Sequence, residues 1–337
     1  MPDAPVGIID SLASGFEIVA AHLQILLLPL GIDLFLWLGP RITLRPLILL
    51  LEQFWLWLAP YGDSTTRAQY FQLAQDTHKL ALTAPDQYLP ILLPPTLLGG
   101  RRASLLPFDF KPGVMETWVG NLVAIMLALI SSVILYEIWY GWIAHYVLNE
   151  PFKPWQFAKQ VMSIVFQSYL ALAASIILVI ASGVLVTTGA TVAFLIGGDV
   201  LYSIVVWLVL FIVLMFVVPA CVMAIFTLHS MFLNRRNLLA GMWDSIRVVQ
   251  WNMLPTTILL ILVGGIYFAM NVIWSLADRG SWLTLAAMGG NAFIATGLIT
   301  ATFVYYKDRY RHWRELREAV LAELERRRAQ QDNNRQV

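Results

Sequence analysis

Residues 161–188, VMSIVFQSYLALAASIILVIASGVLVTT, decide the fold class, because this stretch contains no charged residue. An α-helix rises about 1.5 Å per residue, so about 20 apolar residues cross a hydrocarbon core about 30 Å thick. Across the 337 residues of the chain, 59% are hydrophobic and only 13% are charged, which excludes a soluble protein. The sequence therefore predicts an all-α polytopic membrane protein.

Four other windows are as apolar as this stretch, and a fifth is long enough but carries polar residues and Pro29. We therefore expect about six transmembrane helices in the chain. The four regular windows are 118–140, 201–228, 254–276 and 282–305, and the less regular one is 16–38.

Residues 46–60, PLILLLEQFWLWLAP, form a shorter apolar window between two prolines, with Glu52 inside it. This window is too short to cross the bilayer comfortably, so we expect an interfacial or re-entrant helix anchored by Trp55 and Trp57. The alternative is a seventh span, which would place the N-terminus outside and Arg41 inside. Both arrangements satisfy the distribution of positive charge, so six and seven spans both stay open.

Lysine and arginine in short connections mark the cytoplasmic side of a membrane protein. The basic residues that follow the second and fourth predicted spans include Lys153, Lys159, Arg235 and Arg236. The tail after the sixth span is also basic, whereas the connection 189–200 has no basic residue. We therefore expect a multi-pass protein of the inner (cytoplasmic) membrane with both termini in the cytoplasm. The first ten residues hold no lysine or arginine, so we expect no cleaved signal peptide.

This topology divides the chain into an N-terminal lead with the first transmembrane helix, an external segment with an interfacial helix, a five-helix transmembrane region and a charged cytoplasmic tail. These segments are 1–38, 39–117, 118–306 and 307–337. In the external segment, residues 66–82 show helical spacing of apolar residues and precede a proline-rich run at 84–100. Residues 66–112 are therefore a candidate contact with a protein partner.

Three stretches with scattered polar residues precede apolar spans, and each carries an early aromatic residue. They begin at Ser11, Pro154 and Leu238. The first and third also share an acid, Glu17 or Asp244, and a closing proline. The pattern predicts a threefold internal repeat of an amphipathic lead helix followed by two spans. The alternative is that interfacial helices look alike by composition alone.

The stretches VVPACVMAIF at 217–226 and NLLAGMWDSIRVVQWNMLPTTILLILV at 237–263 carry a resemblance to a known family. They resemble the six-span membrane domain attached to some bacterial glycerophosphodiester phosphodiesterases and found in uncharacterised bacterial membrane proteins. The stretch at 28–44, LPLGIDLFLWLGPRITL, resembles the start of such uncharacterised proteins. No polar segment long enough for the soluble catalytic domain is present, so the resemblance implies a fold and a membrane rather than an activity.

Asp33 and Glu137 are the acids that lie within predicted spans and away from their ends. An acid in the membrane costs several kcal/mol unless it is paired or hydrated, so each is a candidate proton relay, cation site or partner contact. The alternative is a satisfied structural acid near an interface. The two acids lie at different predicted depths, so we do not expect them to pair.

No other constellation of residues indicates catalysis or a cofactor. The five histidines lack metal-ligand spacing, Cys221 is the single cysteine, and the chain has no GxSxG, P-loop or GxGxxG motif. We therefore expect neither a metal nor a cofactor, and the net charge of +1 predicts no nucleic acid partner. The turn Gly99–Gly100–Arg101–Arg102 would contact a phosphate or lipid headgroup, or remain a solvated loop.

The tail 307–337 is expected to continue as a cytoplasmic C-terminal helix with an apolar stripe. The residues of this stripe are Trp313, Leu316, Val320 and Leu324. The stripe predicts a contact with the chain's own leads, with another subunit or with the lipid bilayer. In the last case the basic residues Arg326, Arg327 and Arg328 would contact anionic headgroups.

Three classes of function follow from these features. The lack of motifs favours a non-catalytic membrane protein that acts as a scaffold, assembly factor or accessory subunit. The alternative is a transporter or lipid-handling membrane protein that uses Asp33 or Glu137. An intramembrane enzyme is the third class, and no nucleophile, base or metal constellation supports it.

Overall fold

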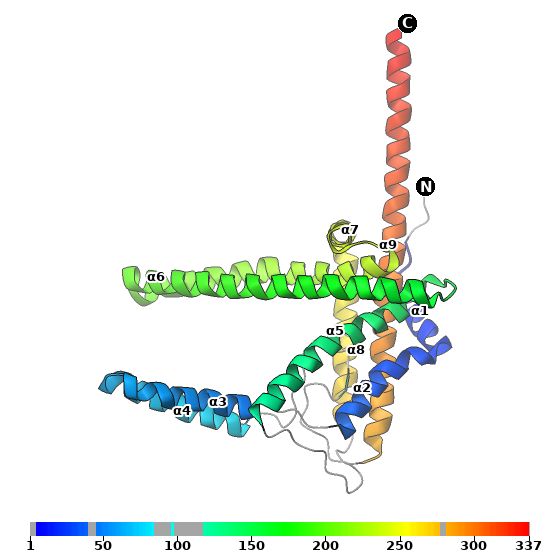
Figure 1. Ribbon diagram of the computed structural model, residues 1–337. Helices are drawn as coiled ribbons and strands as arrows, with labels where there is room; N and C mark the ends of the chain where they lie inside the picture. The colour runs from blue at the N-terminus through cyan, green and yellow to red at the C-terminus, as the bar shows by residue number, and fades with distance from the viewer. Residues whose placement is uncertain (1–4, 40–44, 84–95, 98–116, 277–280, 337) are drawn as a thin grey trace. The chain divides into compact units, whose positions relative to one another are not determined.

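The computed structural model describes residues 5–39, 45–83, 96–97, 117–276 and 281–336. Every regular element in this part of the chain is helical, which confirms the all-α class (Figure 1). The α-helices are α1 Ile8–Ala21, α2 Leu27–Leu38, α3 Arg45–Leu58, α4 Ser64–Thr83, α5 Trp118–Leu148, α6 Pro154–Leu233, α7 Leu238–Trp251, α8 Met253–Ser275 and α9 Leu283–Gln336, with 3₁₀ turns at Leu23–Leu26 and Ala59–Tyr61.

Within the described residues, 5 helices are long and apolar enough to cross a membrane, or up to 6 if one bent pair counts as a single span. This confirms the polytopic architecture. The five candidates are Trp118–Leu148, Pro154–Val192, Leu195–Ile212, Met253–Trp274 and Leu283–Arg328.

The candidate span at 16–38 is a broken helix rather than a continuous one. α1 ends at Ala21, and the chain bends by 91° before the helical segment Leu23–Leu38. His22 leaves the helical region with φ −133° and ψ 60°. Pro29 lies in the first turn of α2, where its missing amide hydrogen leaves no helical bond unmade. The break at His22 therefore divides this window into two helices.

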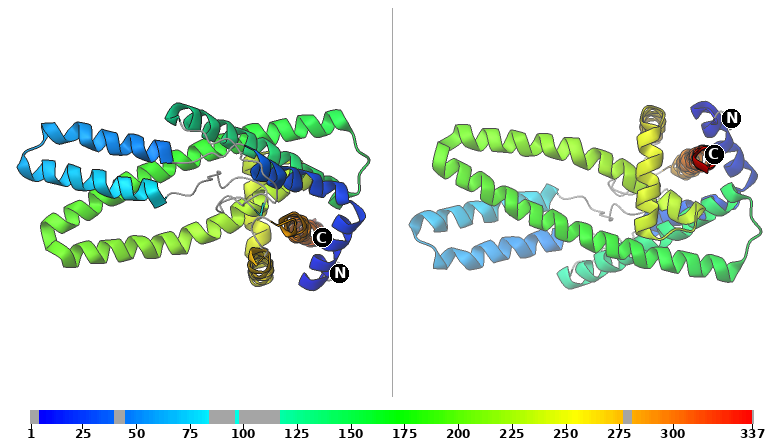
Figure 2. Two further views of the ribbon diagram at one scale, coloured as in Figure 1. Left: turned by 90° about the horizontal axis from the view of Figure 1, so that it is seen from below. Right: turned by 90° about the horizontal axis from the view of Figure 1, so that it is seen from above.

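The expected connection at 189–200 is a sharp kink at one residue rather than a loop, because the rest of this segment is helical. α6 holds 80 residues, and only Gly198 has non-helical angles, φ 61° and ψ −156°. Glycine tolerates this conformation because it has no Cβ. Figure 2 shows α6 doubling back at this point. The predicted spans 161–188 and 201–228 are thus the two arms of one helical hairpin.

The lead helices only partly follow the predicted threefold repeat. The first and third leads are the separate helices α1 and α7, which end before His22 and Asn252. The second lead, which begins at Pro154, continues into α6 without interruption. The repeat therefore stays a prediction, and its second unit differs locally from the other two.

By internal contacts the chain forms two compact units, and each is described separately. The first unit comprises Met1–Gly15, Tyr140–Ile261 and Thr300–Val337. The second comprises Phe16–Trp139 and Leu262–Ile299.

The core of the second unit gathers residues that are distant in sequence. Ile32, Leu36 and Trp37 of α2 pack with Leu97 and with Met288 of α9. A separate helical hairpin forms where α3 packs against α4 (Figures 1 and 2). The predicted helix at 66–82 lies within α4, so this expectation is confirmed.

The start of α4 is capped by Asp63. Its carboxylate accepts a hydrogen bond from the backbone amide of Thr66 at 2.8 Å. The side-chain hydroxyl of Thr66, and then this amide, hold the pKa of Asp63 below its usual value. The cap satisfies one of the free amides at the helix N-terminus and favours the start of α4 at this position.

The first unit combines close helix packing with buried polar contacts. Asp308 accepts a hydrogen bond from the backbone amide of Val6 at 2.7 Å, and Arg309 donates to the Val6 carbonyl at 3.2 Å. His229 Nδ1 donates to the carbonyl of Ile225 at 2.8 Å, which leaves Nε2 to accept from Thr302 at 2.8 Å. These bonds satisfy polar groups that would otherwise be costly to bury.

We expect Gly15→Ala to destabilise the protein by about 1–3 kcal/mol, because extra volume in a tight contact displaces its neighbours. A Cβ at Gly15 would lie 2.5 Å from the backbone nitrogen of Ala301. Thermal unfolding of the purified protein in detergent measures the effect. Gly31→Ala is the control, since a Cβ there meets no atom within 4 Å. An unchanged midpoint for Gly15→Ala would contradict the close packing of α1 on α9.

Candidate functional site

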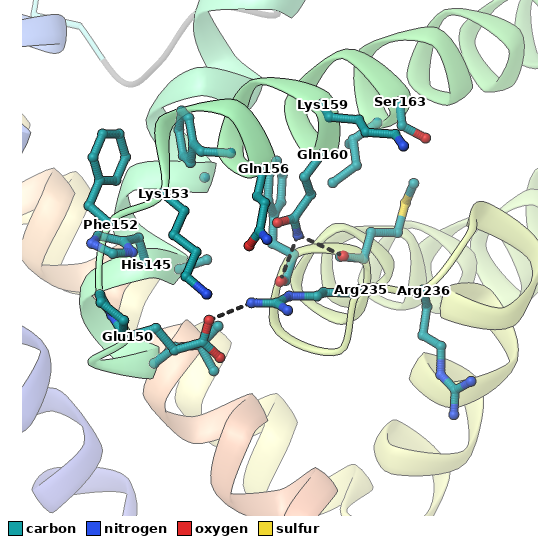
Figure 3. A pocket seen from close by; sticks show the side chains of 18 of the residues that line it. His145, Glu150, Phe152, Lys153, Gln156, Lys159, Gln160, Ser163, Arg235 and Arg236 are labelled. Atoms are coloured by element: carbon teal, nitrogen blue, oxygen red, sulfur yellow. Dashed lines mark hydrogen bonds and ion pairs between the residues drawn. The ribbon is translucent and has the colours of Figure 1, made fainter.

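A pocket of about 620 Å³ lies in the first unit, where both ends of the α6 hairpin meet the end of α5 (Figure 3). Three stretches of chain line it: the last turns of α5 with the connection 149–153, the first turns of α6, and the end of α6 with the connection to α7. A volume of this size is typical of sites for small ligands.

Two connections with unusual backbone conformations form the rim of the pocket. Asn149 has φ 54° and Arg235 has φ 51°, and both are non-glycine residues in the left-handed region. Such residues are uncommon, and asparagine is enriched among them. Pro154 then starts α6, where its missing amide hydrogen leaves no helical bond unmade. Asn237 caps α7 by accepting from the amide of Ala240 at 3.0 Å.

Two glutamine side chains of the first arm of α6 bond the end of α6 and the start of α7. Gln160 donates to the carbonyls of Phe232 at 3.0 Å and Met231 at 3.5 Å, which belong to the returning arm. Gln167 accepts from the backbone amide of Leu238, at the start of α7, at 2.6 Å. These bonds satisfy backbone groups at a helix end and a helix start, which have no partner within their own helix. The pocket is therefore fixed by contacts between residues about 70 positions apart.

The pocket carries an excess of positive charge. Its lining includes Lys153, Lys159, Arg235 and Arg236, against the single carboxylate of Glu150. Arg235 forms an ion pair with Glu150. Figure 3 shows Lys153 beside this pair and Lys159 on the neighbouring turns of α6. Among the described residues, neither lysine forms an ion pair, so their charges are available to a ligand.

Arg236 is held away from the centre of the pocket by groups outside it. Its Nε lies 3.4 Å from a carboxylate oxygen of Asp244, and in Figure 3 its guanidinium points away from the other labelled side chains. The Tyr310 hydroxyl accepts a hydrogen bond from Arg236, and this bond, followed by the charge of Asp244, raises the pKa of the guanidinium. Arg236 therefore stabilises the contact of α7 with α9 rather than the centre of the pocket.

The deeper wall of the pocket is apolar. Phe157 and Ile164 contribute from the first arm of α6, and Met231 and Phe232 contribute from the end of the second arm. Ile164, Met231 and Phe232 are buried. The pocket thus combines amines at its rim with aromatic and aliphatic side chains within it. This combination suits a molecule that has an anionic end and an apolar end.

Asp33, predicted as a candidate functional acid, has a structural contact. It is fully buried in α2, and its Oδ2 accepts a hydrogen bond from the backbone amide of Leu97 at 3.0 Å. Leu97 itself packs into the core beside Trp37. The bond ties part of the predicted external segment to α2, which supports the interpretation of Asp33 as a satisfied structural acid.

Glu137, the second candidate acid, is buried in α5, and in the same turn Trp139 is fully buried. Its carboxylate therefore lies in protein rather than at an exposed surface. The expectation that Asp33 and Glu137 do not pair stays a prediction.

The remaining predicted contacts lie apart from the pocket or outside the described residues. Gly99, Gly100, Arg101, Arg102 and most of 66–112 beyond Thr83 are not described. Arg326, Arg327 and Arg328 are exposed on α9, and Arg327 bonds Glu323 at 2.9 Å. Arg326 lies about 32 Å along the helix axis from Tyr305, so lipid contact requires this part of α9 to lie along the membrane.

Trp313 of the predicted tail stripe contacts a cation of its own chain. The guanidinium of Arg247 in α7 lies 4.9 Å from the ring centre of Trp243 and 5.7 Å from that of Trp313. Cation–π contacts of this kind join α7 to the start of the tail. Leu316, Val320 and Leu324 are exposed. The first turn of the stripe thus packs on a lead of its own chain, as one of the three alternatives predicted.

The lysines and arginines of the pocket were predicted only to mark the cytoplasmic side. Their spacing held a further signal: Lys153 and Lys159 precede a pair of apolar windows, and Arg235 and Arg236 follow the same pair. The two ends of a helical hairpin lie close together, so a hairpin over these windows predicts that both basic clusters lie at one site. No group of three or more potential metal ligands is found among the described side chains.

No known protein family, curated protein or solved structure matches the chain. The resemblance to the membrane domain of glycerophosphodiester phosphodiesterases therefore stays a prediction. The properties of the pocket itself are the guide to function.

Proposed function

We propose that the chain is a non-catalytic, lipid-handling membrane protein that binds the headgroup of an anionic phospholipid in this pocket. The observation that carries the proposal is the pair Lys153 and Lys159, which lack carboxylate partners among the described residues and stand above an apolar wall. A membrane protein meets one abundant class of molecule with an anionic end and an apolar end, and that class is the anionic lipid.

The chemistry of the rim suits a phosphate group. Lysine amines form charge-assisted hydrogen bonds with phosphate oxygens, and Gln156 and Ser163 add neutral donors to the same lining. Phe157 and Phe232 offer an apolar surface to the glycerol and the first acyl carbons. Each basic residue near an anionic membrane surface contributes about 1 kcal/mol to association.

The distribution of basic residues supports a cytoplasmic position for the pocket. Connections rich in lysine and arginine stay in the cytoplasm, and the pocket is built from two such connections. The cytoplasmic leaflet is also where anionic lipids give a negative surface potential. We propose on this basis that the ligand comes from the cytoplasmic leaflet of the inner membrane, with both termini on the same side.

The proposal changes which residues serve lipid handling. Asp33 is already engaged by the amide of Leu97, so transport through this carboxylate has less support than binding at the rim lysines. An accessory-subunit role is the second candidate, because Leu316, Val320 and Leu324 remain exposed on α9. That role predicts a protein partner that copurifies through the C-terminal helix and is lost when these three residues are replaced by serine.

The direct test is lipid selectivity of the purified full chain. Native mass spectrometry in a neutral detergent, with equal amounts of phosphatidylglycerol and phosphatidylcholine, is expected to show preferential retention of phosphatidylglycerol. Equal retention of the two lipids would contradict the proposal, since only the headgroup with a net negative charge is attracted to the lysine amines.

We expect Glu150→Gln to strengthen binding of phosphatidylglycerol about three- to tenfold. The substitution removes the only carboxylate among the described lining residues and releases Arg235 to the ligand, a change of about 1 kcal/mol at an exposed site. Titration of the detergent-solubilised full chain with phosphatidylglycerol measures the affinity. Glu318→Gln removes an acid of a comparable exposed pair, with Arg314, away from the pocket, and is expected to leave the affinity unchanged. Weaker binding by Glu150→Gln would show that the carboxylate contributes to the site.

A further inference from the structure

The hairpin of α3 and α4 exposes apolar side chains that its own contacts do not cover. None of the residues of α3 is buried, and Leu50 and Trp57 are 39% and 59% exposed. The side chains that α4 buries are small: Ala74, Thr77 and Ala81. An apolar surface of this kind is unfavourable if both faces of the hairpin are exposed to water.

The dimensions and charge of α3 exclude a transmembrane position. Its 14 residues make a helix about 21 Å long, shorter than a hydrocarbon core of about 30 Å. Glu52 lies in the middle of α3, and its carboxylate is 3.0 Å from Nδ1 of His78 in α4. α4 thus provides a polar partner for the one acid of α3. This arrangement keeps Glu52 on the side of α3 that faces α4.

The aromatic residues of the hairpin form a continuous group. Phe54 lies 5.4 Å from Trp55 and 6.2 Å from Trp57, and Trp57 lies 5.4 Å from Tyr61, between ring centres. Trp55 also stacks on Tyr70 of α4 at 6.2 Å. Tryptophan and tyrosine are enriched at the boundary between headgroups and acyl chains, where a ring with one polar atom is stable.

The chain also holds this hairpin close to the bilayer. Six residues separate Leu38, the end of the α2 helix, from Arg45, the start of α3. Such a connection reaches about 25 Å at most. α2 belongs to the bent pair that is a candidate membrane span. α3 therefore cannot move far from the membrane surface.

From these observations we infer that the α3–α4 hairpin lies in the headgroup–acyl boundary of the bilayer, with the outer face of α3 in lipid and the outer face of α4 toward water. The occupant of the apolar surface is therefore lipid rather than a protein. Positions 52 and 55 of α3 face α4, so positions 50, 54 and 57 lie on the opposite, lipid-facing side at helical spacing. On α4 the corresponding water-facing position is Gln72, half a turn from the buried Ala74.

Spin labels at single cysteines test this arrangement in the full chain reconstituted in vesicles. Cys221→Ser removes the one natural thiol, and Leu50→Cys and Gln72→Cys then supply one label each. Oxygen concentrates in lipid, and a nickel chelate stays in water. We expect the label at position 50 to collide mainly with oxygen and the label at position 72 mainly with the nickel chelate.

Phe54→Cys provides a second lipid-facing site if the variant at position 50 fails to fold. Strong collision of the labels at positions 50 and 54 with the nickel chelate would place α3 in water and overturn the inference. Immobile labels that both reagents fail to reach would show a protein surface instead of lipid, which also overturns it. A label at position 72 that responds mainly to oxygen would exclude the orientation of α4.

Discussion

Replacing both Lys153 and Lys159 by glutamine is expected to weaken binding of phosphatidylglycerol about thirtyfold and to leave binding of phosphatidylcholine unchanged. Each exposed lysine near an anionic headgroup contributes about 1 kcal/mol, and 1.4 kcal/mol corresponds to a factor of ten. Fluorescence anisotropy of a labelled short-chain phosphatidylglycerol, titrated with the detergent-solubilised full chain, measures the loss.

Glutamine keeps most of the length of lysine and can still donate hydrogen bonds, so the effect reports mainly on charge. The wild-type affinity is expected to fall with added salt, and the double variant is expected to show a weaker salt dependence. Arg326→Gln with Arg328→Gln removes two positive charges from the exposed end of α9 and is the matched control. A large loss in this control, with none in the lysine variant, would move the lipid contact to the C-terminal helix.

Asp33→Leu is expected to lower the stability of the protein by about 1–3 kcal/mol, because it leaves the buried amide of Leu97 without its acceptor. Thermal unfolding in detergent measures the change. Hydrogen exchange of the peptide that contains Leu97 is expected to accelerate in the same variant, since the hydrogen bond from the Leu97 amide to α2 is lost. Both readouts follow from a structural role for the carboxylate.

Asp33→Asn separates this role from transport. Asparagine keeps an oxygen that accepts the Leu97 amide, so the unfolding midpoint is expected to stay close to that of the wild type. A variant that folds as stably as the wild type, but loses a proton or cation flux that the wild type shows in proteoliposomes, would make Asp33 a transport residue. That result would support the alternative that the protein is a transporter that uses Asp33.

Hydrophobic length was sufficient to predict much of the fold. The windows 118–140, 254–276 and 282–305 correspond to segments of α5, α8 and α9, because uninterrupted apolar runs of this length leave few alternatives to a helix in lipid. Length alone did not locate breaks. At 16–38 the helix breaks at His22, and at 189–200 the chain reverses at Gly198 while the rest of the segment stays helical.

The site was less predictable because it depends on contacts between distant residues. Gln160 reaches the carbonyl of Phe232 across 72 positions, and Asp33 reaches Leu97 across 64. Neither partner is marked by a local motif. The charges of the pocket were visible in the sequence, but their meeting required the hairpin of α6. The hairpin brings together basic residues that in the sequence indicate only the cytoplasmic side, and so forms the candidate binding site.

The most direct test of lipid binding in the pocket is photochemical labelling of the chain in a bilayer. A phosphatidylglycerol that carries a diazirine on the first acyl carbons would be crosslinked to the reconstituted protein, and the modified peptides mapped by mass spectrometry. We predict that labelling concentrates in residues 148–167 and 231–237 and is displaced by unlabelled phosphatidylglycerol. Labelling spread evenly over the spanning helices, or equal labelling of the pocket by a phosphatidylcholine analogue, would contradict the account.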